Sequence, residues 1–119
     1  MKSLLSAAAL AEIATGAALL LVPVLVCEML LGAEASGTAV IVARVTGIAL
    51  VSLGIACWPG PPMSGMLVYS AAITAYLAYV GLAGEANGML LWPVVVLHAA
   101  MTALLGWSWV GARRAAPSQ

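Results

Sequence analysis

Phenylalanine is absent from the 119-residue sequence, and charged side chains are scarce: four Lys or Arg and four Asp or Glu, 7% of the chain. Because soluble domains carry about 25% charged residues, a surface that faces water on all sides is excluded. The formal net charge is zero, so the chain has neither a basic patch for nucleic acid nor an acidic tail. What is present is 65% hydrophobic, which indicates an integral membrane protein.

Apolar runs of membrane-spanning length occupy most of the chain. A helix needs about 20 apolar residues to cross the hydrocarbon of a bilayer, and four runs reach this length: residues 4–26, 38–58, 66–84 and 90–110. The first run is too long for the apolar core of a signal peptide, so we interpret it as a span. We therefore predict an all-α, polytopic membrane protein, a compact antiparallel bundle of four transmembrane helices that forms one domain over residues 1–119.

The distribution of charge predicts how the bundle is oriented. The basic residues near the two chain ends fall on one side of the membrane after four crossings, and they are Lys2, Arg113 and Arg114. The connections on the other side contain the acidic residues Glu28, Glu34 and Glu85. Because cytoplasmic segments are enriched in Lys and Arg, both termini are predicted to be cytoplasmic.

Small side chains recur at helix-packing spacings within the predicted spans, which lets helix backbones approach closely. The rows are Ala43, Gly47 and Gly54 in the second span, Ala71, Ala75 and Ala78 in the third, and Ala99, Ala103 and Gly106 in the fourth. Their commonest role is packing inside a bundle, but the same rows could dock a partner. The expected partners are the lipid bilayer, further copies of the chain or other membrane subunits, and no nucleic acid.

Pro23 and the two cysteines lie near predicted helix ends. Pro23 falls in the last turn of the first span and is expected to end or bend that helix. The segment after it, VLVCEMLLGAE, is predicted to lie at the membrane interface. Cys27 and Cys57 end different spans about 30 Å apart, so a disulfide between them is not expected.

Three ionisable residues, Glu12, Arg44 and His98, lie inside the predicted spans. Such a residue costs about 2.5–3.5 kcal/mol on insertion scales and by default marks a functional site. With a rise of about 1.5 Å per residue, Arg44 lies about 9 Å below the outer ends of the helices, and Tyr76 and His98 lie about 12 Å below them. Arg44, Tyr76 and His98 therefore form a candidate cofactor-binding pocket in the outer leaflet.

Two interpretations of Arg44 stay open. Its long side chain can extend outward to a lipid phosphate or to a loop glutamate (Glu28, Glu34 or Glu85). Alternatively, it can point inward as the cation of the pocket. Glu12 is deeper, about 21 Å from the same face, and is protonated, hydrogen-bonded within the bundle, or paired with Arg44; it is also the candidate for proton coupling.

His98 lies in the stretch VVVLHAAMTALLGW. A lone membrane histidine can donate a hydrogen bond to a backbone carbonyl, and it can also ligate a tetrapyrrole. The stretch resembles the histidine-containing span of light-harvesting antenna polypeptides, and this resemblance implies tetrapyrrole binding at His98. Because the chain has one histidine, haem with two histidine ligands from one chain is excluded.

Two families of small four-helix membrane proteins share local features with the chain. LAEIATGAALLL resembles the first helix of small multidrug resistance transporters, which implies a proton- and substrate-coupling role for Glu12. The chain departs from that family in two respects. Its second span contains an arginine, and its third span lacks the aromatic and glycine pattern of the family. RVTGIALVSLG and the four-span layout resemble DoxX-type bacterial inner-membrane proteins, a resemblance that implies the bundle architecture and, for some members, a subunit of a quinone-linked system.

The sequence contains no HExxH, CxxC, Walker A or GxSxG motif, so it predicts neither an enzyme nor a metal site. The first hypothesis is a non-catalytic accessory or oligomeric subunit of a membrane complex. The second is a small proton-coupled transporter that uses Glu12. The third is a quinone-, lipid- or tetrapyrrole-binding subunit that uses Arg44 and His98.

Overall fold

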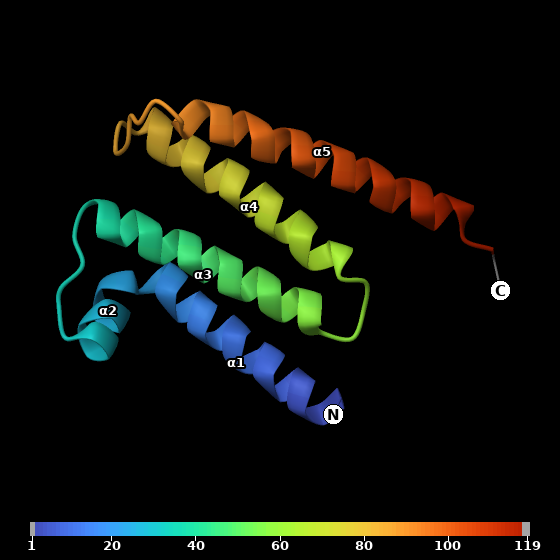
Figure 1. Ribbon diagram of the computed structural model, residues 1–119, viewed down its shortest axis with the longest axis horizontal. Coiled ribbons are helices and arrows are strands. Elements are labelled where there is room, and N and C mark those ends of the chain that lie inside the picture. The colour runs from blue at the N-terminus through green and yellow to red at the C-terminus, as the bar shows by residue number, and fades with distance from the viewer. Residues whose placement is uncertain (1, 118–119) are drawn as a thin grey trace. The chain divides into compact units, whose positions relative to one another are not determined.

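A computed structural model describes residues 2–117. This part of the chain folds into helices without strands (Figure 1), and its helices are α1 (Lys2–Leu21), α2 (Pro23–Leu31), α3 (Thr38–Cys57), α4 (Met63–Leu82) and α5 (Leu91–Ala115). All of them except α2 are long and apolar enough to cross a membrane. The predicted all-helical fold and its four long apolar helices are confirmed, and the structure adds a fifth, short helix.

The additional helix arises because the first predicted span is broken at Pro23. Proline has no backbone N–H, so the helical hydrogen bond to the carbonyl of Leu19 cannot form. Val22 leaves the helical region with φ −132° and ψ 58°, and α2 begins at Pro23. It ends at Gly32, whose φ of +72° is left-handed and whose N–H donates to the carbonyl of Glu28 at 3.0 Å. Residues 22–26 therefore lie outside α1, whereas the sequence predicts them within the first span.

The chain divides between Tyr69 and Ser70, within α4, into two compact units. In the first unit α1 and α3 run antiparallel and in close contact (Figure 1): Gly16 of α1 faces Gly47 of α3, and Gly54 of α3 faces Ala9 near the other end of α1. The row of small residues predicted in the second span is buried in α3, as expected of a packing row. The short helix α2 contacts both α1 and α3.

The second unit contains the remainder of α4, from Ser70 onward, and the whole of α5. These two helices run side by side (Figure 1). A Cβ added at Gly81 would meet the ring of Trp92 at 2.9 Å and the side chain of Leu91 at 3.0 Å, so the two helices approach closely at this end. Several of the small residues predicted to pack in these two helices are not buried, unlike the row in α3. Ala75, Ala99 and Ala103 are exposed.

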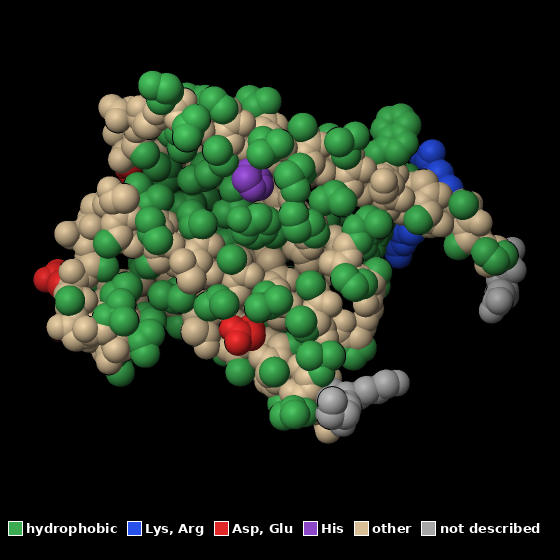
Figure 2. Space-filling view, viewed as in Figure 1, with side chains coloured by type: hydrophobic (Ala, Val, Ile, Leu, Met, Phe, Trp, Pro, Cys, Tyr) green, Lys and Arg blue, Asp and Glu red, His purple; other side chains and the backbone are tan. Residues whose placement is uncertain are grey.

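The surface of the described residues is apolar. Few side chains of the four long helices are buried, and the exposed ones include many leucines, valines and tryptophans; Figure 2 shows hydrophobic side chains over much of one face with few charged ones. Such a surface is stable in lipid and not in water. The chain is thus a multi-span membrane protein. The predicted single domain, compact four-helix bundle and cytoplasmic termini stay predictions.

Candidate functional site

Arg44 lines a hollow in the first unit, where α2 turns away from α1 next to the beginning of α3. The hollow has a volume of about 420 Å³. Apolar side chains form most of its wall, and its lining is Leu21, Val22, Pro23, Val24, Leu25, Glu28, Val40 and Arg44. We call it the Arg44 hollow. It exists because the chain breaks at Pro23, which places the beginning of α2 opposite the second turn of α3.

The Arg44 hollow contains one cation and one anion that are not joined to each other. Arg44 is partly buried and Glu28 is exposed. Within residues 2–117, neither side chain forms an ion pair or a hydrogen bond. A guanidinium has five N–H donors and no acceptor, so Arg44 keeps its full capacity for an external acceptor. Of the three glutamates that the sequence offers to Arg44, Glu28 is the one that shares its hollow.

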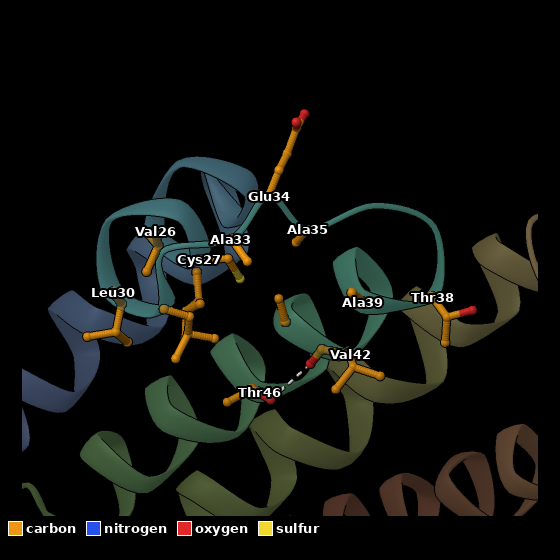
Figure 3. Close-up of a pocket in the computed structure, with 13 residues that line it drawn as sticks. Val26, Cys27, Leu30, Ala33, Glu34, Ala35, Thr38, Ala39, Val42 and Thr46 are labelled. Carbon is orange, nitrogen blue, oxygen red and sulfur yellow. Dashed lines mark hydrogen bonds between the residues drawn. The ribbon is translucent and has the colours of Figure 1, made fainter.

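A second, larger cavity lies on the other flank of α2 (Figure 3). It has a volume of about 560 Å³ and is lined by α2, the loop that follows and the first turns of α3, with Leu19 of α1. Its wall is almost entirely apolar. Figure 3 shows that Glu34 points away from it, and the hydroxyl of Thr46 already donates to the carbonyl of Val42 at 2.9 Å. We call this cavity the apolar groove; Cys27, a free thiol, is part of its lining.

Tyr76 and His98, the other residues of the predicted pocket, belong to the second unit. The hydroxyl of Tyr76 is buried and has no hydrogen-bond partner in the described part of the chain. The Nδ1–H of His98 donates to the carbonyl of Val94 at 2.9 Å, and Thr102 donates to the carbonyl of His98 at 2.7 Å. The backbone hydrogen bond considered for His98 is therefore present. A pocket that joins these residues to Arg44 stays a prediction.

Glu12 is partly buried on α1 and lines neither the Arg44 hollow nor the apolar groove. Among the described residues its carboxylate forms no ion pair, so the pairing with Arg44 considered from the sequence is not formed. Its role in proton coupling stays a prediction.

Four hydroxyl groups in the long helices are satisfied within their own helix. Thr46, Ser52, Thr74 and Thr102 each donate to the carbonyl four residues earlier, at 2.7–2.9 Å. This back-bonding lets a polar side chain sit in an apolar helix without a partner from another helix. These residues therefore contribute little to a polar site, whereas the buried hydroxyls of Ser70 and Tyr76 have no hydrogen-bond partner among the described residues.

The Arg44 hollow and the apolar groove were not predicted from the sequence. Their signal was Pro23 together with the apolar segment that follows it, but the direction in which α2 turns depends on its packing against α3. Comparison with known protein families, curated proteins and solved structures finds no match. The resemblance to DoxX-type proteins therefore stays a prediction, and the function has to be inferred from the cavities and exposed faces themselves.

Proposed function

We propose that the protein is a non-catalytic subunit of an assembly in a bacterial inner membrane, and that the assembly contains at least two copies of the chain joined through α5. The observation that carries this proposal is a hollow of about 400 Å³ along one side of α5. The described residues that line it all belong to α5, and they are Ala103, Gly106, Trp107, Val110, Gly111 and Arg114. We call it the α5 hollow.

The glycines of α5 have different surroundings from those of the α1–α3 contact. Gly16, Gly47 and Gly54 meet backbone or side chains of a neighbouring helix, where a Cβ would clash. Gly106 and Gly111 face open space. A glycine in a helix interior is less stable than alanine by about 1 kcal/mol, and in lipid this cost is offset where another helix packs closely against it.

A second copy of α5 fits this hollow. A two-fold contact uses the same surface patch on both chains, and a face of small residues flanked by Val110 and Trp107 offers both the groove and the ridge for such a contact. The α1–α3 contact demonstrates that helices of this chain associate through glycine in this way.

Disulfide crosslinking between α5 helices tests the proposal. In a background with Cys27→Ala and Cys57→Ala, Gly106→Cys is expected to form a crosslinked dimer in native membranes. Leu104→Cys, two residues away and exposed, is the matched control and is expected to remain monomeric. Absence of the Gly106→Cys dimer, or equal crosslinking at both positions, would overturn the α5 contact.

Gly106→Leu provides an independent readout in the chain with its native cysteines. A Cβ built at Gly106 meets no atom of the described residues within 4 Å. This substitution is therefore expected to leave the fold of the single chain intact. It is expected to convert dimers to monomers in native mass spectrometry from mild detergent. If native mass spectrometry instead detects an assembly of one copy of the chain with other proteins, the proposed α5–α5 contact is wrong.

Proton-coupled transport has less support from the cavities. Glu12 lines neither the Arg44 hollow nor the apolar groove, so proton-coupled transport through it stays a prediction. Quinone or tetrapyrrole binding by His98 also stays a prediction.

A further inference from the structure

The Arg44 hollow combines two opposite charges with apolar walls. Arg44 enters it from α3 and Glu28 from α2, and they form no ion pair with each other. The remaining lining is aliphatic, with leucines and valines from the α1–α2 junction and Val40 from α3. A ligand that fills this hollow therefore has an apolar part and a polar part that satisfies both charges.

The position of Arg44 along α3 sets the depth of the polar part. Arg44 is six residues after Thr38, where α3 begins, which corresponds to about 9 Å along the helix axis. An arginine side chain reaches the lipid headgroup level from this depth. Its planar fork of donors matches the geometry of a phosphate, which it can bind through two parallel hydrogen bonds.

Glu28 decides which phosphate group fits. A headgroup with negative charge alone would be attracted by Arg44 and repelled by the carboxylate in the same hollow. A headgroup that carries a phosphate and a primary ammonium satisfies both residues, because the ammonium donates to Glu28 while the phosphate accepts from Arg44. Its acyl chains then lie against the leucines and valines of the wall.

We propose that the Arg44 hollow is a binding site for a zwitterionic phospholipid of the surrounding bilayer, whose headgroup contains a phosphate and a primary ammonium, as in phosphatidylethanolamine. Arg44 binds the phosphate and Glu28 binds the ammonium. This site lies in the first unit and is independent of the α5 contact, so either proposal can fail without the other.

Lipid retention measures the proposed selectivity directly. The full chain is reconstituted in nanodiscs that contain equal amounts of phosphatidylethanolamine and phosphatidylglycerol, and the lipids that remain bound after release are counted by native mass spectrometry. The wild type is expected to retain phosphatidylethanolamine preferentially. Arg44→Gln is expected to reduce retention at least about tenfold, the lower range for a hydrogen bond to a charged group.

Glu28→Gln gives the sharper result. Glu28 is exposed, so this variant is expected to fold normally even if Arg44→Gln does not. Without the carboxylate, the hollow has only a positive charge, and its preference is expected to change from phosphatidylethanolamine to phosphatidylglycerol. The matched control is Glu34→Gln, which removes a carboxylate that points away from the neighbouring groove (Figure 3) and is expected to keep the wild-type preference.

Three outcomes would overturn the proposal. The first is a wild-type protein without lipid preference, and the second is an unchanged preference in Glu28→Gln. The third is that Arg44 and Glu28 stabilise only each other. In that case both single variants lower the melting temperature equally in every lipid, the double variant restores it, and lipid retention stays constant.

Discussion

Gly16 and Gly47 face each other at the α1–α3 contact so closely that neither can carry a side chain. A Cβ on Gly16 would lie 2.6 Å from the carbonyl oxygen of Gly47, and a Cβ on Gly47 would lie 2.6 Å from the carbonyl oxygen of Gly16. The relationship is reciprocal, and in both cases the obstacle is backbone, which cannot move aside as a flexible side chain can. This glycine pair sets how near α1 and α3 approach.

Alanine at either position is therefore expected to destabilise the first unit. Gly16→Ala or Gly47→Ala should separate the helices and reduce stability by about 1–3 kcal/mol, the usual range for overpacking. The measurement is thermal unfolding in detergent, followed by circular dichroism. Gly106→Ala is the control: its Cβ meets nothing within 4 Å, so helix propensity alone acts and the melting temperature should stay equal or rise. Equal melting temperatures for all three variants and the wild type would contradict the close contact.

The α1–α3 contact also indicates how far the sequence determines the fold. Length and apolarity predict the four long helices because the bilayer sets both requirements. The row of Ala43, Gly47 and Gly54 predicts the packing face of α3, and all three are buried. The equivalent spacing in α5 predicts the same role for Ala99 and Ala103, yet both are exposed. Spacing identifies a face that can pack, but it does not identify the partner.

The candidate functional site depends on tertiary structure even more than the helix packing does. The helical rise places Arg44, Tyr76 and His98 at similar depths, but depth says nothing about the direction in which a side chain points around its helix. The sequence therefore offers three glutamates to Arg44 without ranking them. Glu28 shares the hollow because α2 turns at Pro23 and packs against α3. That turn depends on contacts between α2 and α3, which are separate segments of the chain, and local patterns do not encode such contacts.

Tyr76 contains a buried hydroxyl without a hydrogen-bond partner among the described residues, and this predicts an unusual response to substitution. Removing an unsatisfied buried polar group relieves its desolvation cost, which is about 1–3 kcal/mol. Tyr76→Phe is therefore expected to maintain or raise the melting temperature. Tyr79→Phe is the control, because Tyr79 is 60% exposed and should change little. A clear loss of stability in Tyr76→Phe would mean that its hydroxyl has a partner, such as a bound lipid or cofactor, in the membrane.

Substitution of Glu12 tests whether its carboxylate only destabilises α1 in the membrane or has a functional role. Glu12 is partly buried and has no ion-pair partner among the described residues, and a charged residue within a span costs about 2.5–3.5 kcal/mol on insertion scales. Glu12→Gln is expected to raise the melting temperature in lipid, whereas Glu34→Gln in the exposed loop should leave it unchanged. A decrease for Glu12→Gln would indicate a partner. Proton uptake into vesicles that is lost in the same variant would support the transporter hypothesis.

Pro23 connects the fold to the lipid site, because the missing N–H at this position separates α2 from α1. Pro23→Ala restores the donor that the carbonyl of Leu19 lacks, and Val22 can then return to helical geometry. We expect α2 to continue α1 as one helix, so that Glu28 leaves the Arg44 hollow while both charged residues are still present in the chain. The preference for phosphatidylethanolamine should fall as it does in Glu28→Gln.

Pro93→Ala is the matched control, since Pro93 lies in the first turn of α5, where backbone N–H groups have no helical acceptor anyway. It should leave lipid retention unchanged. If Pro23→Ala also keeps the wild-type preference, the packing of α2 against α3 is sufficient to hold the break open, and the proline is not required for it. A loss of preference in Pro23→Ala alone would demonstrate that the position of α2, and not only the presence of Arg44 and Glu28, creates the lipid site.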